Sequence, residues 1–165
     1  MSDTKQLVKQ LREMTGAGIL DCKKYLVKAN NDIDEAIKLF RSESGIKANK
    51  KGSRIAAEGL VNFYENSDAL LLLELNSETD FVARDANFIT LAESIAKKLL
   101  DNNESDVANV ISNDITSAIS KLGENIKLRR HIKIKKNNSV YGYTHNNKIA
   151  SLVELKNDNT SLAKD

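Results

Sequence analysis

Three stretches near the start of the chain carry apolar residues at the spacing of a helix. They lie in residues 3–13, 19–29 and 33–40. Residues three and four apart share one face of a helix, so each stretch predicts an amphipathic helix. Gly16 and Gly18 separate the first two, and Asp32 is suited to cap the third. The pattern predicts a compact three-helix module, and modules of this size usually bind another macromolecule.

From Gly59 the helical spacing gives way to the alternation of a β-strand. Side chains alternate between two faces over residues 60–65, a polar turn follows at Asn66–Asp68, and Ala69–Leu75 is an almost continuous apolar run. The two strands predict an antiparallel hairpin. Because the second strand is apolar at nearly every position, we expect both of its faces to be buried.

Two helices are predicted after this hairpin. The first is capped by Asp85 and carries one full apolar stripe. The second runs from about Ser105 to Leu122, with Asn113–Asp114 as a candidate break. Gly123 follows it and is well placed as the residue just beyond a helix end.

The last third of the chain predicts further strands. Residues 126–135 alternate, with Ile126, Leu128, Ile132 and Ile134 expected on one face. The other face then carries basic residues, namely Lys127, Arg129, His131, Lys133 and Lys135. This basic face has two explanations, simple solvation or contact with RNA or phosphate. Residues 140–145 and 148–155 predict a second hairpin around Asn146–Asn147, a pair typical of a type I′ turn.

The two hairpins resemble each other in sequence. Residues 69–80, ALLLLELNSETD, can be laid over residues 149–160, IASLVELKNDNT. Each copy is a return strand that ends in Glu-Leu, followed by a polar turn and the start of a helix. Only the first copy continues into a complete helix, so we expect the second unit to be incomplete. The fold class expected is α+β, with a three-helix module followed by duplicated hairpin-plus-helix units.

Composition is that of an ordinary globular chain of 165 residues, with 41% hydrophobic and 29% charged residues. Cys22 is the only cysteine, which excludes a disulfide framework and favours an intracellular compartment. No apolar run approaches the length of a membrane span. Residues 1–54 carry a net charge of +5, from 12 basic and 7 acidic residues, whereas the remainder carries −3. This difference suggests a separate N-terminal module.

The sequence contains no recognisable catalytic constellation. The two histidines, His131 and His145, fall in predicted strands without a nucleophile at readable spacing. Phosphate-binding glycine loops and clusters of metal-ligand residues are also missing. These observations predict a binding protein rather than an enzyme, with no cofactor and no metal.

The most informative stretch is the connection after the apolar strand, where Asp80 and Phe81 stand side by side. Binding residues are often found on loops held by rigid elements. The alternative is that Asp80 only caps the following turn and Phe81 folds into the core.

Four motifs carry a resemblance to a known family. They are LREMTGAGILDCKKYL (Leu11–Leu26), ELNSETDFVARD (Glu74–Asp85), KLGENIKLRR (Lys121–Arg130) and the YxH of Tyr143–His145. In this order they resemble the motifs of bacterial elongation factor Ts, the guanine-nucleotide exchange factor for elongation factor Tu. The resemblance implies four segments. These are a ubiquitin-associated-like module (1–45), a basic linker (46–58), the N half of the core (59–123) and the start of its C half (124–165).

The resemblance also implies the residues of a binding site. Thr79, Asp80, Phe81 and Val82 match the element that intrudes near the Mg²⁺ and nucleotide site of the GTPase. Other matching contacts are Arg12, Ile19, Leu20, Lys23, Leu122, Gly123 and His145, with core burial as the alternative for Leu20. Family members are usually longer and many carry a dimerisation insertion, so dimerisation stays open. The implied compartment is the bacterial cytoplasm or an organelle matrix.

Three functions therefore compete. An exchange factor needs no chemistry of its own, because it only has to bind the nucleotide-free GTPase better than the GDP-bound form. A ribosome- or RNA-binding module would use the basic strand face and the basic linker, and its binding would fall steeply with salt. An adaptor for ubiquitin-like proteins would need the helical module alone.

Overall fold

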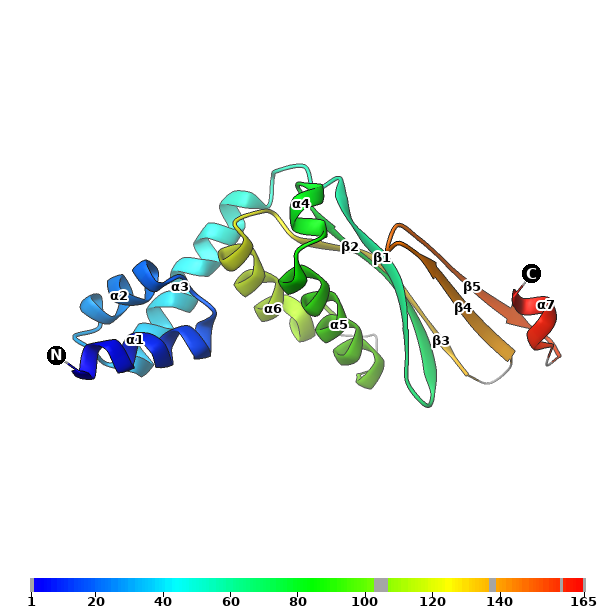
Figure 1. The fold of residues 1–165 in the computed structure, drawn as a ribbon, viewed down its shortest axis with the longest axis horizontal. Coiled ribbons are helices and arrows are strands. Elements are labelled where there is room, and N and C mark those ends of the chain that lie inside the picture. The colour runs from blue at the N-terminus through cyan, green and yellow to red at the C-terminus, as the bar shows by residue number, and fades with distance from the viewer. Residues whose placement is uncertain (1, 103–106, 137–138, 158, 165) are drawn as a thin grey trace. The chain divides into compact units, whose positions relative to one another are not determined.

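The computed structural model describes residues 2–102, 107–136, 139–157 and 159–164. It contains both helices and antiparallel sheets, which confirms the α+β class (Figure 1). The chain divides into two compact units. Unit 1 comprises residues 1–54 and 115–125, and unit 2 comprises residues 55–114 and 126–165.

Unit 1 contains the three predicted helices, α1 (Ser2–Thr15), α2 (Ile19–Lys28) and α3 (Ile33–Lys51). Asp32 caps α3 by accepting a hydrogen bond from the Glu35 amide at 2.9 Å, as expected. The core of the unit gathers the apolar stripes of all three helices, with Leu11, Cys22 and Tyr25 almost fully buried. The three-helix prediction is therefore confirmed.

Helix α3 continues through residues 46–51, the first part of the segment 46–58 that was expected to be a basic linker. Ser44 and Ala48 are buried and prolong the stripe of Phe40 by one and two turns. Ser44 also donates a 3.2 Å hydrogen bond to the hydroxyl of Ser120 in α6 (Val107–Leu122). Small residues at these positions let the two helices approach, and this contact supports the longer helix.

Unit 2 is built on a three-stranded antiparallel sheet in the order β1 (Glu58–Glu65), β2 (Ala69–Ser77), β3 (Lys127–Lys135). The central strand β2 is buried along most of its length, as its apolar run predicts. Helix α5 (Ala86–Asp101) packs on the face that carries Tyr64, whose pKa is raised in part by Glu93 of that helix. The opposite face is met by a second hairpin, where Gly142 lies against the ring of Phe63.

That second hairpin consists of β4 (Ser139–His145) and β5 (Ile149–Leu155). Asn146 and Asn147 between them have φ angles of 51° and 54°, the left-handed values that a type I′ turn requires. Helix α4 (Asp80–Ala83) follows the first hairpin and α7 (Thr160–Lys164) follows the second. The two helices begin at equivalent positions of the sequence repeat.

Two sequence expectations are wrong. The first concerns the basic strand face, because a register shift opposite Glu74 and Leu75 inserts an extra residue at Arg129–Arg130. The shift places Lys133 and His131 on the α5 face, opposite Leu71 and Leu73, whereas Lys127 lies opposite Asn76 on the other face. The basic residues therefore do not form one continuous surface.

Lys133 is also already bound within unit 2. Its ammonium donates to the carbonyl oxygens of Leu99, Leu100 and Asn102 at the C-terminal end of α5, at 2.7 to 3.0 Å. A cation at this end of a helix is favoured by the helix dipole. This strand thus gives little support to the RNA-binding alternative.

The second wrong expectation is the break at Asn113–Asp114. Helix α6 runs through both residues without interruption. The carboxylate of Asp114 accepts a 2.6 Å hydrogen bond from Lys98 of α5, so a tertiary ion pair compensates for the weak helix propensity of aspartate. The expected start of this helix, Ser105, lies outside the described residues.

Candidate protein-binding site

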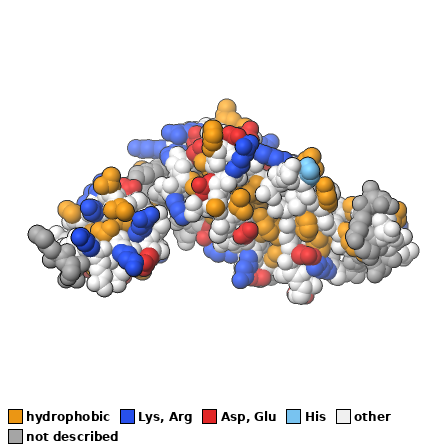
Figure 2. Space-filling view, in the orientation of Figure 1, with side chains coloured by type: hydrophobic (Ala, Val, Ile, Leu, Met, Phe, Trp, Pro, Cys, Tyr) orange, Lys and Arg blue, Asp and Glu red, His pale blue; other side chains and the backbone are white. Residues whose placement is uncertain are grey.

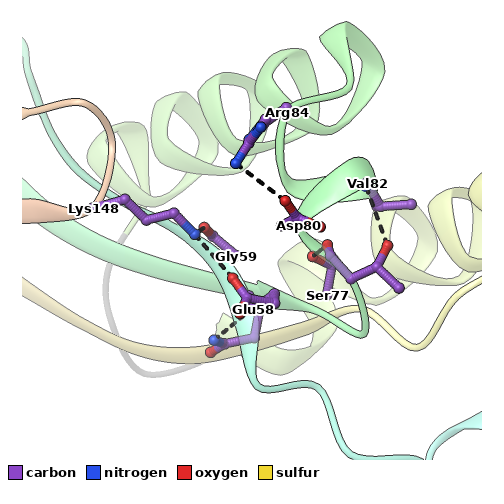
Figure 3. Close-up of polar contacts among 9 residues, drawn as sticks. Glu58, Gly59, Ser77, Asp80, Val82, Arg84 and Lys148 are labelled. Carbon is purple, nitrogen blue, oxygen red and sulfur yellow. Dashed lines mark hydrogen bonds and ion pairs between the residues drawn. The ribbon is translucent and has the colours of Figure 1, made fainter.

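Phe81 projects from α4 and is 84% exposed. Thr79, the residue just before the helix, is its N-cap, with an extended backbone (φ −123°, ψ 158°) and a side-chain oxygen 3.4 Å from the Val82 amide (Figure 3). The alternative in which Phe81 folds into the core is therefore wrong, as is the alternative in which Asp80 is the cap. Figure 2 shows hydrophobic side chains projecting among Lys and Arg in the region of α4.

Asp80 is the first residue of α4 and forms an ion pair with Arg84, one turn later, at 3.1 Å. Its side chain is 41% exposed and that of Arg84 is 76% exposed. Ion pairs at this exposure contribute little to stability. Asp80 therefore stays accessible to a hydrogen-bond donor from outside. Sequence reasoning missed Arg84, although the four-residue spacing was the available signal.

His145 ends β4 and is exposed beside the turn Asn146–Asn147. Its Nδ1 lies 3.5 Å from the hydroxyl of Tyr143, and its Nε2 lies 3.1 Å from Nδ2 of Asn146. Tyr143 is 58% exposed and was not singled out as a site residue in the sequence, apart from its place in the YxH motif. The imidazole of His145 and the hydroxyl of Tyr143 are thus neighbouring polar groups on an exposed surface.

The turn with His145 and helix α4 lie at the same end of the unit 2 sheet. The Val61 amide of β1 donates to the carbonyl oxygen of Asn147 at 2.8 Å. Glu58 at the start of β1 pairs with Ser77 at the end of β2, two residues before the cap of α4. The structure therefore brings both elements to the edge where β1 begins and β2 ends.

In unit 1, Ile19, Leu20 and Lys23 lie on the outer side of α2 and are exposed. Leu20 is 82% exposed, so the alternative of a core position is wrong for it. The physical reason is helical spacing, because the buried face of α2 carries Cys22, Tyr25 and Leu26 and leaves Leu20 on the opposite side. Arg12 in the last turn of α1 is also exposed.

Leu122 and Gly123 end α6 within unit 1. Gly123 has φ +82° and its amide donates to the carbonyl oxygen of Ile119 at 3.0 Å, the geometry expected beyond a helix end. A Cβ on Gly16 would lie 3.5 Å from the side chain of Lys121. The end of α6 therefore lies beside the turn between α1 and α2, which joins Arg12 to Ile19 and Leu20.

The titratable groups of the unit 1 core are structural. Burial raises the pKa of the Cys22 thiol, which keeps it protonated and unreactive. Burial and the hydrogen bond to Glu43, 3.1 Å away, raise the pKa of Tyr25 to about 12. Within the described parts of the chain, no cluster of three or more metal-ligand side chains occurs and no helix is long and apolar enough to cross a membrane.

The two units thus define an α+β protein whose candidate residues are mostly exposed side chains on rigid elements, an arrangement suited to binding a protein. The model of the elongation factor Ts family matches residues 78–165. The chain is 45% identical to elongation factor Ts of Marinobacter nauticus, over 98% of this chain and 58% of that protein. It therefore belongs to the elongation factor Ts family.

Other relatives agree. Elongation factor Ts of Saccharophagus degradans is 43% identical over 100% of this chain and 60% of its own length. Elongation factor Ts of Legionella pneumophila strain Paris is 41% identical over 96% of this chain and 59% of its own length. The chain spans about three fifths of the length of these relatives.

Proposed function

We propose that this chain binds elongation factor Tu in its GDP-bound form and promotes the release of GDP, so that GTP can rebind. Membership in the elongation factor Ts family supports a role in translation. The observation that carries the exchange mechanism is the 84% exposed ring of Phe81 on a capped helix. An aromatic ring exposed to water is unfavourable, and its burial by a partner lowers the free energy of the complex.

In this mechanism Phe81 enters an apolar slot near the Mg²⁺ site of the GTPase, and Asp80 accepts a hydrogen bond from the same partner. Burial of the ring supplies about 1.5–3 kcal/mol, which helps to hold a displaced segment of the GTPase. Mg²⁺ coordination is disturbed indirectly, so the chain needs no metal ligand. By linkage, the factor by which this chain prefers the nucleotide-free GTPase is also the factor by which it weakens the affinity of the GTPase for GDP.

The remaining candidate residues have supporting roles. Arg12, Ile19, Leu20 and Lys23 contact a helix of the GTPase domain, and Leu122 and Gly123 lie beside the nucleotide site. His145 contacts a different domain of the partner. The place of action is the compartment that holds elongation factor Tu, a bacterial cytoplasm or an organelle matrix.

The test is the release of fluorescent GDP from elongation factor Tu at increasing concentrations of this chain. We expect the unchanged chain to accelerate release and Phe81→Ala to lose about ten- to a hundredfold of that acceleration, from the burial energy of one ring. Leu162→Ala is the matched control, because Leu162 is also a large exposed apolar residue, 61% exposed, but lies in α7, which packs on β4 and β5. Equal losses for both variants would contradict the proposal.

A further inference from the structure

The turn that follows His145 is fastened to the edge of β1. Asn147 accepts a hydrogen bond from the Val61 amide at 2.8 Å through its carbonyl oxygen. Its side-chain oxygen accepts a second one, at 3.0 Å, from the side-chain amide of Asn62. The position of this turn on the sheet is therefore set by contacts outside its own hairpin.

Lys148 adds a contact at the very start of β1. Its ammonium donates to Oε2 of Glu58 at 3.1 Å and to the carbonyl oxygen of Gly59 at 3.1 Å (Figure 3). The side chains of Lys148 and Glu58 are 49% and 46% exposed, so the ion pair alone is weak. The hydrogen bond to the partly buried Gly59 oxygen adds a directed contact.

The same end of β1 is tied to the chain that leads into α4. Asn76 of β2 donates from its side chain to the carbonyl oxygen of Glu58 at 2.9 Å. Ser77, the next residue, donates to the carbonyl oxygen of Thr79, the cap of α4, at 3.0 Å. A continuous series of hydrogen bonds thus runs from the turn beside His145 to the helix that carries Phe81.

We propose that Lys148 is a positioning residue that holds the turn of His145 in a fixed place relative to α4, so that the partner meets His145 and Phe81 as one preformed surface. This inference rests on the proposed exchange function. Two contacts held in place before binding lose less conformational entropy than two that must be ordered on binding. Lys148 itself need not touch the partner.

The proposal is tested with Lys148→Met, which keeps most of the side chain's length and removes its charge, in the GDP-release assay. We expect the concentration of chain that gives half-maximal release to rise about three- to tenfold, the loss of one ordinary hydrogen bond, because Lys148 is half exposed, with little change in the maximal rate. Lys148→Arg restores two donors and is expected to restore the value. Lys135→Met, an exposed lysine on β3, is the matched control and is expected to have no effect.

Combining Lys148→Met with His145→Ala separates positioning from general stability. If Lys148 acts through His145, the double variant is no worse than the poorer of the two single variants. Effects that multiply, or a Lys148→Arg variant that behaves like Lys148→Met, would overturn the proposal.

The hydrogen-exchange rate of the Val61 amide measures, in the absence of the partner, how firmly the turn is bound to β1. We expect faster exchange in Lys148→Met than in the unchanged chain, because the bond to Asn147 opens more often. Unchanged exchange would overturn the proposal. If Lys148→Met exchanges faster but the unchanged chain does not accelerate GDP release, the proposed function is refuted and the positioning role of Lys148 is not.

Discussion

The hydroxyl of Ser77 donates a hydrogen bond to the carbonyl oxygen of Thr79 across 3.0 Å. Ser77 has no exposed surface and ends β2, whereas Thr79 caps α4. The bond therefore fixes the direction in which the chain leaves the sheet and enters the helix that carries Phe81.

Ser77→Ala tests this bond. We expect the free energy of unfolding to fall by about 1 kcal/mol, because the carbonyl oxygen of Thr79 loses one of its two donors and keeps only the Ala83 amide at 3.2 Å. We also expect more of the chain to be needed for half-maximal GDP release. Urea unfolding and the release assay measure the two effects. Ser67→Ala, at an exposed turn position, is the control, and a similar loss of stability in both variants would contradict the role of the bond.

Gly59 occupies a position that no other residue fits. Its φ is +145°, and a Cβ there would lie 2.1 Å from the carbonyl oxygen of Leu75. We therefore expect Gly59→Ala to destabilise unit 2 by about 3 kcal/mol or more, or to prevent its folding. Gly45→Ala is the opposite case, since nothing lies within 4 Å of a Cβ in the middle of α3. That variant is expected to gain about 0.5–1 kcal/mol in thermal or urea unfolding.

Tyr64 makes unit 2 sensitive to alkaline pH. Burial, with a contribution from Glu93, raises the pKa of Tyr64 from 10.0 to about 12. The raised value means that folding favours the neutral phenol, so this contribution to stability is complete below pH 10 and is lost as the pH rises towards 12. We expect unfolding by urea to become easier over that interval, and less so in Tyr64→Phe. Equal pH dependence in both proteins would refute the assignment.

Leu20 is expected to matter for binding and not for folding. It is 82% exposed on α2, so Leu20→Ala removes little packing within the chain. We expect its affinity for elongation factor Tu to fall about tenfold, in line with the burial of one leucine, while the thermal midpoint stays unchanged. Val27→Ala, on the same helix and 75% exposed, is the control for a general loss of surface hydrophobicity. A lower thermal midpoint for Leu20→Ala would indicate a structural role instead.

Much of the fold could be predicted because the apolar pattern of each element is strong. The observed elements correspond directly to the apolar stripes of α1, α2 and α5 and to the apolar run of β2. The predicted type I′ turn is found at Asn146–Asn147. The candidate residues were identified by their resemblance to family motifs. The hydrophobic pattern could not predict that their side chains are exposed. Leu20 and Phe81 are as apolar as core residues, and only their place in the fold makes them surface residues.

The expectations that failed depended on contacts between elements. Alternation assigned the cations of β3 to one face, but the bulge at Arg129–Arg130 reverses the pattern part of the way along the strand. Arg130 was the available signal, since it interrupts the apolar positions. The break at Asp114 failed because Lys98, distant in sequence, pairs with that residue.

The most direct test of the exchange mechanism measures Phe81→Ala against the unchanged chain in GDP release with Mg²⁺ and again in excess EDTA. If Phe81 accelerates GDP release by disturbing the Mg²⁺ site of the GTPase, removal of Mg²⁺ makes this contribution unnecessary. With Mg²⁺ we predict that Phe81→Ala accelerates GDP release about ten- to a hundredfold less than the unchanged chain. In EDTA we predict nearly equal rates of release for the two proteins. An equal deficit in both buffers, or none in either, would contradict the mechanism.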